Sequence, residues 1–363
     1  MKKRTLYYFT PSNINESDAS AVRAYHNTEG LKKFFDIEVS YATNNENLFF
    51  NLPSNKDSLI KRLVLEILVG LELVVRKFIF KKYDFYILSS PSFVTVVIQA
   101  LFLGLTKKQY FLDVRDIYPE VFFHLGIVKE NSLLGRILKK ITRRVYLKAQ
   151  GVVTVTNGLL EIINDYKTNT PSKVIYNGFD LELFKNSRKS SQFTVIFHGN
   201  MSKMQNIDLL LEISNQLPDD IKLIVIGDGP QSFKVKAQKN INYLGKLAHK
   251  NLVRYVNSSH VGLSLRNDGL VNSTALPVKV FEYIGAGLNI ISTPISEVGT
   301  VFKEYNGIFE FSNNDVDKIV KKVIELKKLN FQKTYYEVPL QFSRQNQSAI
   351  FCEFVLKTIE MKI

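Results

Sequence analysis

The chain has 363 residues, 45% of them hydrophobic, and a formal net charge of +14. This length exceeds one typical hydrophobic core and favours two domains. The single cysteine, Cys352, excludes an internal disulfide and a thiolate zinc site and fits a reducing compartment. The positive charge favours an anionic partner, such as a membrane surface, a nucleic acid or a phosphorylated substrate.

Two apolar segments near the N-terminus resemble a signal peptide or a membrane span in composition. The first stops at Phe9 and is followed by polar residues, so we expect a first strand and no signal peptide. The second, 59–80, carries six charged residues, whereas a membrane span needs about 20 mostly uncharged ones. We therefore predict a long amphipathic helix there.

Short apolar runs alternate with helical patterns through the first half of the chain, which is typical of βαβ units and a parallel sheet. The predicted strands are 6–10, 37–41, 85–89, 110–114, 152–156 and 174–176. The predicted helices are 19–34, 58–81, 93–105, 133–149 and 158–166. The polar residues in 181–192 then indicate a linker.

A second alternating series follows the linker. Its predicted strands are 194–198, 222–226, 242–244, 261–265 and 289–292. Its predicted helices are 206–216, 230–239, 247–257, 277–286, 296–304 and 315–328, and a last helix covers 346–361. The fold class is therefore α/β, with two doubly wound Rossmann-like domains facing across a cleft. We place the domains at 1–185 and 186–345, with 346–363 as a C-terminal helix.

Two glycine turns in the second half suit a phosphate group. His198 ends a strand, and Gly199, Asn200 and Lys203 follow it with a flexible backbone and a positive charge. An ordinary turn capped by an asparagine explains this stretch equally well. The second turn, Gly227 to Gly229, has a composition that is common in turns and is a weaker signal.

The stretch 277–287 (PVKVFEYIGAG) predicts a short helix with Pro277 at its first position and glycines at its end. The N-terminus of such a helix favours an anion. Glu282 is able to accept hydrogen bonds from a ribose diol, as acidic residues do in dinucleotide sites. The spacing by itself favours a solvated glutamate near the start of the helix.

The densest polar cluster of the first half is 113–120 (DVRDIYPE), directly after a predicted strand. Strand ends of this kind face the ligand crevice of an open α/β sheet. Asp116 is a candidate base and Arg115 a candidate phosphate ligand. A loop in which arginine and aspartate pair with each other is an equally weighted alternative.

The five histidines show no metal-binding spacing, so the sequence predicts no metal site. They are His26, His124, His198, His249 and His260. Only His198, beside the first glycine turn, is expected in a pocket.

Residues 131–160 contain no acidic side chain, and the predicted helix within them is basic on one face. Its apolar residues Leu134, Ile137, Ile141 and Val145 recur at helical spacing and are expected in the core. The basic face is a candidate for contact with anionic lipids, and a merely solvated face is the alternative. Its members are Arg136, Lys139, Lys140, Arg143, Arg144 and Lys148. One aromatic residue among these charges argues against nucleic acid.

Taken together, five motifs resemble the GT-B fold glycosyltransferases of family 4, in particular a bacterial branch that builds cell-surface polysaccharides. They occur in the family's order and span both predicted domains. The motifs are 113–120 (DVRDIYPE), 174–180 (VIYNGFD), 198–206 (HGNMSKMQN), 225–230 (VIGDGP) and 277–287 (PVKVFEYIGAG).

This resemblance implies a retaining, metal-independent transfer of a sugar from a UDP- or GDP-linked donor, with no cofactor. The acceptor is expected to be an oligosaccharide or a lipid-linked glycan, bound by the N-terminal domain with Arg115 and Asp116 at the reaction centre. The C-terminal domain is expected to hold the nucleotide, and the C-terminal helix 346–363 is expected to cross back to the N-terminal domain. Its expected donor residues are His198, Gly199, Asn200, Lys203, Gly227, Gly229, Lys246, Leu247, Pro277, Lys279 and Glu282.

The same resemblance implies a cytoplasmic protein, peripheral on the inner face of the cell membrane, that binds no nucleic acid. The chain departs from the family where Thr274 stands, since many members carry a first glutamate eight residues before the one at Glu282. A nucleotide-sugar epimerase and a non-catalytic glycan- or nucleotide-binding partner of a transferase are the alternative functions.

Overall fold

A computed structural model describes residues 3–16, 18–53, 58–185, 187–293, 297–329 and 339–360. The chain divides into two compact units, Met1–Tyr176 with Gln347–Ile363, and Asn177–Asn346. The division thus falls between Tyr176 and Asn177, and the described residues of the expected linker belong to the second unit. Asn186 of that linker, position 296 of a predicted helix and the end of the last helix lie outside the described residues.

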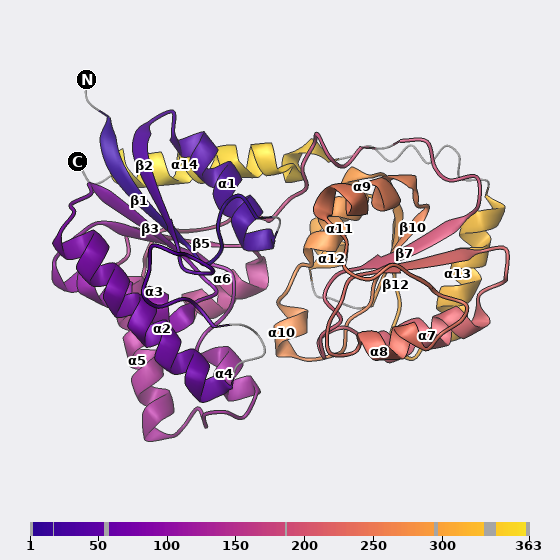
Figure 1. Cartoon of the computed structure of the whole chain (residues 1–363), viewed down its shortest axis with the longest axis horizontal. Coiled ribbons are helices and arrows are strands. Elements are labelled where there is room, and N and C mark those ends of the chain that lie inside the picture. Colours follow the sequence, from indigo (N-terminus) through magenta and orange to yellow (C-terminus); the bar gives the residue numbers. More distant parts are fainter. Residues whose placement is uncertain are drawn as a thin grey trace. The chain divides into compact units, whose positions relative to one another are not determined.

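The first unit is built on a six-stranded sheet in the order β2-β1-β3-β4-β5-β6 (Figure 1). All its strand pairs are parallel, which confirms the predicted βαβ organisation. The strands are β1 Arg4–Thr10, β2 Phe35–Tyr41, β3 Phe85–Ser89, β4 Tyr110–Val114, β5 Gly151–Thr154 and β6 Ser172–Val174.

Helices cover both faces of this sheet because the strands are apolar on both. Successive side chains of a strand point to opposite faces. On β1, Tyr7 and Phe9 pack with the helices of one layer, and Leu6 and Tyr8 pack with those of the other. The first layer comprises α2 Leu59–Leu73, α3 Phe93–Leu105 and α5 Leu133–Lys148; the second comprises α1 Ala19–Leu31 and α14 Arg344–Glu360. Two shorter helices are α4 Glu120–His124 and α6 Asn157–Asn164.

The second unit has its own six-stranded parallel sheet, in the order β12-β11-β10-β7-β8-β9. Its strands are β7 Thr194–His198, β8 Lys222–Ile226, β9 Asn242–Tyr243, β10 Val261–Ser264, β11 Asn289–Ser292 and β12 Ile308–Glu310. The helices are α7 Ile207–Gln216, α8 Ser232–Lys236, α9 His249–Ser258, α10 Leu270–Ser273, α11 Val278–Gly285, α12 Val298–Val301 and α13 Val316–Lys328. A 3-10 turn, η3, covers Leu340–Phe342. The sequence did not predict β12 or α10.

The strand order of the second unit fixes where a ligand is expected. Reading outward from the centre, β8 and β9 follow β7 to one side, while β10, β11 and β12 continue on the other. This is the Rossmann order, whose crevice lies beyond the carboxyl ends of the two central strands. The loops after β7 and β10 flank that point, and an isolated bridge joins Gln205 to Arg266 across it.

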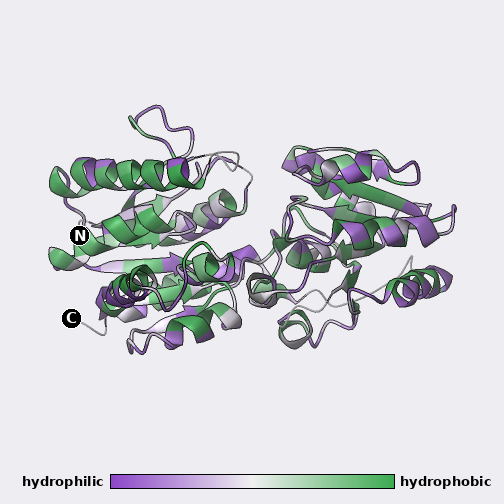
Figure 2. Cartoon of the chain, turned by 90° about the horizontal axis from the view of Figure 1, so that it is seen from below, coloured by the Kyte–Doolittle hydropathy of each residue, from purple (hydrophilic) through white to green (hydrophobic). Residues whose placement is uncertain are grey.

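The predicted helix over 59–80 is present, but in two parts: α2 continues directly into a π-helix, η1 Val74–Ile79. Figure 2 shows long hydrophobic stretches on the helices of the first unit. The long helix expected here is therefore present, and its solvent-facing side carries large apolar residues as well as charged ones. Within the described residues, no helix has both the length and the apolar character needed to cross a bilayer.

Candidate functional site

The two glycine turns predicted separately are joined in the second unit. The Gly199 N–H donates to the Ile226 carbonyl at 3.0 Å, and the Gly227 N–H donates to the Gly245 carbonyl at 2.8 Å. Both glycines have a positive φ, 128° at Gly199 and 135° at Gly227. A Cβ on Gly227 would lie 1.9 Å from the Gly199 carbonyl oxygen, so this close approach requires glycine.

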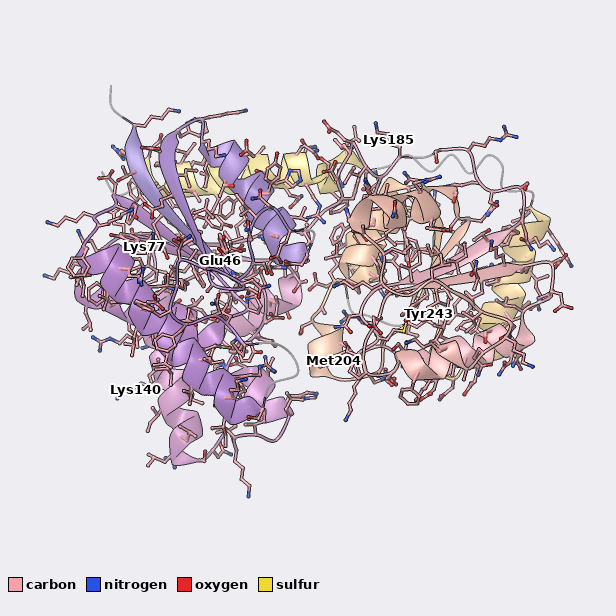
Figure 3. All side chains as sticks on the ribbon, in the orientation of Figure 1. Glu46, Lys77, Lys140, Lys185, Met204 and Tyr243 are labelled. Atoms are coloured by element: carbon pink, nitrogen blue, oxygen red, sulfur yellow. The ribbon has the colours of Figure 1, made fainter. Side chains whose placement is uncertain are left out.

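A tyrosine and a methionine carbonyl hold the neighbouring loops in place (Figure 3). The Tyr243 hydroxyl donates to the Gly227 carbonyl at 2.9 Å. The Met204 carbonyl accepts from the Asn267 N–H and from the Asn272 side-chain amide, both at 3.1 Å. Loops that follow β7, β8 and β10 are therefore fixed relative to one another by hydrogen bonds.

Helix α11 begins at Val278, and Pro277 stands at its N-cap. The expectation of Pro277 as the first helical residue is thus one position early. The predicted glycine stop is confirmed, since the helix ends at Gly285 and Gly287 has a φ of 67°. Residues 279 to 285 are all buried, so the helix has no solvated side along this stretch.

Glu282 lies in this buried stretch, and the reading of it as a solvated glutamate is wrong. Its carboxylate oxygens lie 3.3 Å from His198 Nε2 and 3.7 Å from His249 Nε2. Burial acts to raise the pKa of Glu282, but the two histidines and Arg344 outweigh it and lower that pKa below its ordinary value. Glu282 is thus held as a carboxylate, the form that accepts hydrogen bonds.

His198 is buried beside this carboxylate. Burial lowers the pKa of His198 to about 4, against the opposing charge of Glu282. Its Nε2 lies near Glu282 but has no hydrogen-bond partner among the described residues. The imidazole is therefore neutral at pH 7, with one ring nitrogen able to donate a hydrogen bond and the other able to accept one.

Lys279 is the buried cation of the site. Its ammonium donates to Gln205 Oε1 at 2.9 Å and lies 4.0 Å from the centre of the Phe197 ring. A Cβ on Gly199 would lie 3.4 Å from the Lys279 Nζ, so the ammonium borders the first glycine turn. Burial, followed by the charge of Arg266, lowers the pKa of Lys279 to about 7.

Arg266 is a site residue that the sequence analysis missed. Its Nη1 donates to Asn272 Oδ1 at 2.9 Å, while its Nε is buried without a hydrogen-bond partner in the described part of the chain. Burial lowers the pKa of Arg266 to about 10. The only sequence signal was a basic residue shortly after a predicted strand, at the point where the crevice opens.

The charge of Arg266 disfavours the ammonium of Lys279, and a buried cation is costly without an anionic partner. Glu282 offsets part of this charge at Lys279. A bound anion would form charge-assisted hydrogen bonds with both cations. The region between the glycine turns and α11 is therefore suited to an anionic ligand.

The other predicted donor residues lie on the same loops with varied exposure. Asn200, Lys203 and Lys246 are exposed, whereas Leu247, Gly227 and Gly229 are partly buried. His249, which was considered only as a histidine without metal spacing, begins α9 and contacts Glu282. No group of three or more His, Cys, Asp or Glu side chains within the described ranges is arranged to hold a metal ion.

In the first unit, Asp113 is fully paired. Arg23 Nε and Nη2 donate to its carboxylate at 2.9 to 3.2 Å, and Ser89 Oγ donates at 3.1 Å. Arg23 Nη1 also donates to the carbonyls of Ile175 and Tyr176. The alternative of a loop that pairs its own arginine and aspartate is therefore wrong for Asp113, whose partner comes from α1.

Arg115 and Asp116 follow Asp113 and differ in their surroundings. The Arg115 N–H donates to Ser90 Oγ at 2.8 Å, and its Nη1 donates to Ser20 Oγ at 2.5 Å. Burial lowers the pKa of Arg115. Asp116 is exposed at the surface of its unit. The candidate base is thus accessible, and the arginine is anchored by two serines.

The basic helix α5 is only partly what the sequence predicted. Val145 is buried, but Leu134 and Ile137 are 54% and 44% exposed, so the expected core stripe holds only in the second half of the helix. Lys139 pairs with Glu130, and Arg143 Nε donates to the Tyr166 carbonyl at 3.0 Å. The remaining predicted membrane-face residues, Arg136, Lys140, Arg144 and Lys148, are exposed. Figure 3 shows Lys140 at the outer edge of this helix.

Comparison with known proteins finds similar sequences among glycosyltransferases. Residues 179–345 match the family described as glycosyl transferases group 1. The chain is also 22% identical, over 243 residues, to the Bacillus subtilis (strain 168) protein named as teichuronic acid biosynthesis glycosyltransferase TuaH. That alignment covers 61% of this chain and 60% of the relative's length.

Solved structures show the same fold over nearly the whole chain. Sucrose-phosphate synthase from Thermosynechococcus elongatus has a TM-score of 0.65 at 11% identity, covering 99% of this chain and 98% of that one. Anabaena HepE in complex with UDP-glucose has a TM-score of 0.62 at 14% identity, covering 99% of both chains. The predicted α/β fold with two Rossmann-like sheets, of the GT-B type, is therefore confirmed.

Proposed function

We propose that this protein transfers a sugar from a nucleotide-sugar donor to a glycan acceptor during cell-surface polysaccharide synthesis. The observation that carries the proposal is a pair of cations, the buried Lys279 and the partly buried Arg266, beside the glycine turn at the switch point of a Rossmann-type sheet. A diphosphate has the charge and size that such a turn binds. The match of 179–345 to glycosyl transferases group 1 agrees with this ligand.

Each donor residue has an expected role in this proposal. Lys279, Arg266 and the turn around Gly199 hold the diphosphate, with Lys203 contributing at the rim. Glu282 accepts from the ribose hydroxyls, and Lys246 and Leu247 lie near the base. HepE binds UDP-glucose, so a UDP-linked donor is the first choice, with GDP-linked donors next.

The reaction breaks the bond between the sugar's anomeric carbon and the diphosphate oxygen and forms a bond from that carbon to an acceptor hydroxyl. Negative charge develops on the departing diphosphate, and preorganised cations stabilise it. The acceptor's proton passes to Asp116 or to the departing phosphate. We propose retention of the anomeric configuration, no metal requirement, and membership of family 4.

The acceptor and the location are further parts of the proposal. We expect an oligosaccharide or lipid-linked glycan, consistent with a relative whose name refers to teichuronic acid biosynthesis. Arg115 and Asp116 act on this acceptor. The exposed bases of α5 favour a peripheral position on an anionic cytoplasmic membrane surface.

Thermal stabilisation by a panel of nucleotide sugars identifies the donor, because a ligand that binds only the native state raises the apparent stability. The selected donor is then incubated with and without lipid-linked acceptors, and the product anomer is determined by NMR. Transfer that depends on the acceptor supports the proposal. Isomerisation of the donor without acceptor would make the protein an epimerase, and nucleotide binding without turnover on any acceptor would make it a binding partner.

Glu282→Gln tests whether Glu282 binds the ribose of the donor or only stabilises the fold. It keeps the shape of the side chain and removes the charge that His198 and His249 face. We expect weaker donor binding and lower turnover with the fold retained. Unchanged donor affinity would remove Glu282 from the donor site.

A further inference from the structure

We propose that the outer face of α2 and η1 is a docking surface for an anionic lipid bilayer. Six residues, spaced three or four apart, form what we call the apolar stripe: Ile60, Val64, Ile67, Leu71, Val75 and Ile79. Their exposed fractions run from 42% at Ile67 to 76% at Ile60. Contiguous apolar surface of this kind on a soluble domain marks an interaction site.

The opposite side of the same helix is ordinary core. Val69 and Leu73 are fully buried in the first unit, and a Cβ on Gly70 would lie 3.1 to 3.3 Å from Ile98 of α3. One side of α2 therefore packs closely against α3, while the apolar stripe on the other side is not covered by any described residue of its unit. Because α2 already has a well-packed side, the stripe is not needed to fold it.

The charges around the stripe identify its occupant. Segment 59–82 carries six basic residues, Lys61, Arg62, Arg76, Lys77, Lys81 and Lys82. Three of them form ion pairs, Arg76 with Glu72, and Lys77 and Lys81 with Glu38. The two acidic residues of the segment are turned inward. Glu66 accepts from the Val94 N–H at 2.9 Å, and Glu72 accepts from the N–H groups of Phe49 and Phe50 at 2.9 and 3.0 Å. The outward face thus combines apolar and basic groups, which is the composition of an interfacial helix on anionic lipids.

Two exposed phenylalanines extend this surface. Phe80 follows η1 and is 78% exposed, and Phe49 is 83% exposed. The loop that bears Phe49 is tied to α2 by Glu72, and the Arg76 guanidinium lies 4.7 Å from the centre of the Phe49 ring. A cavity of about 500 Å³ lies beside them, and its lining includes Arg76, Lys77 and Phe80. Aromatic rings next to cations are typical of the headgroup level of a bilayer.

A second copy of the chain fits this surface less well. In a two-fold dimer, the same patch meets itself. This surface carries six basic residues against the three carboxylates of Glu38, Glu66 and Glu72, so its net positive charge would then face itself. An anionic lipid surface supplies the opposite charge along the whole length of the helix.

This surface rests on the membrane partner already proposed for α5 and adds a second exposed apolar surface on another helix of the same unit. Helix α3 packs against both α2 and α5, so all three belong to one layer of the first unit. Charge reversal at Arg143, Arg144 and Lys148 tests the α5 face, whereas the variants below test the stripe. Failure of one test therefore does not imply failure of the other.

The protein contains no tryptophan, so an introduced one reports on a single site. We would make Phe80→Trp, with Phe233→Trp in the second unit as the control, because Phe233 is also highly exposed. Vesicles of phosphatidylcholine with phosphatidylglycerol are added, and brominated lipids serve as quenchers. We expect a blue shift and quenching for Phe80→Trp but not for Phe233→Trp. Cosedimentation with vesicles while Phe80→Trp shows neither change would overturn the proposed surface.

A second variant measures how much the stripe contributes to binding. Ile60→Gln, Ile67→Gln and Leu71→Gln together should lower vesicle partitioning by at least about tenfold. Leu183→Gln, Phe233→Gln and Leu340→Gln alter exposed residues of the second unit and should leave partitioning unchanged. Light scattering without lipid gives the oligomeric state of each variant. Undiminished partitioning of the stripe variant, or a dimer that only this variant loses, would overturn the proposal.

Discussion

Two buried charged clusters stand near strand ends in the two units, and they differ in how their charge is balanced. In the first unit, the Asp113 carboxylate is matched by Arg23, and the rest of the guanidinium is satisfied by carbonyls. In the second, Lys279 and Arg266 share a region where Arg266 Nε has no partner among the described residues. A cluster that satisfies itself supports the fold, whereas one left with surplus charge is suited to a ligand.

The largest expected effect is on the balanced pair. Arg23→Ala leaves the Asp113 carboxylate buried and unpaired, so we expect the free energy of unfolding to fall by about 3–5 kcal/mol. Urea denaturation measures this change, with the exposed Lys33→Ala of the same unit as the control. A loss below about 1 kcal/mol would mean that Asp113 does not depend on its partner.

The second largest effect is expected on donor binding when the positive charge of Lys279 is removed. Lys279→Met keeps an unbranched chain of similar size and removes the ammonium, so we expect the affinity for the nucleotide-sugar donor to fall about thirtyfold or more. Stability should be unchanged or slightly higher, because a buried charge that Glu282 offsets only in part is removed. Calorimetric titration and urea denaturation of the same sample measure the two quantities. A large stability loss with normal affinity would give Lys279 a structural role and erase the contrast with Asp113.

The pH dependence of donor binding sharpens the same contrast. The pKa of Lys279 in the free protein is lowered to about 7, so the ammonium is fully present only below that pH. A diphosphate favours the protonated form, and donor affinity should therefore fall as pH rises through 7, by up to about tenfold per pH unit. A nucleotide sugar is the right probe because it has no phosphomonoester to titrate. The dependence should be absent in Lys279→Met; if it persists there, another group is responsible.

The smallest effect on donor binding is expected for Lys203, at the exposed edge of the site. Lys203 is exposed, so Lys203→Ala should weaken donor binding by only about 0.2–1 kcal/mol, and less at higher salt. Lys239→Ala, also exposed but on another part of the unit, is the control. An effect as large as that of Lys279→Met would mean that Lys203, and not only the buried lysine, makes a main contact with the phosphates.

Much of the fold was predictable from the sequence because its signals are local. Alternating apolar runs predicted eleven of the twelve strands named above, and the missed one, β12, is a short edge strand with a partly exposed pattern. Glycine and proline marked the turn at Gly227 and the end of α11, since their backbone preferences do not depend on distant residues. The apolar spacing in α5 was also visible, but not that its first half would lie outside the core.

The site depended on contacts between residues that are far apart in the sequence. By itself, the sequence determined two parallel α/β sheets, the two glycine turns and the helix that carries Glu282. Only the tertiary structure decided that Glu282 is buried against His198 and His249, that Lys279 borders Arg266, and that Asp113 pairs with Arg23, ninety residues away. The reason is physical: backbone preference and hydrophobic period are set by near neighbours, whereas the burial and pairing of a charge are set by whatever the fold packs around it.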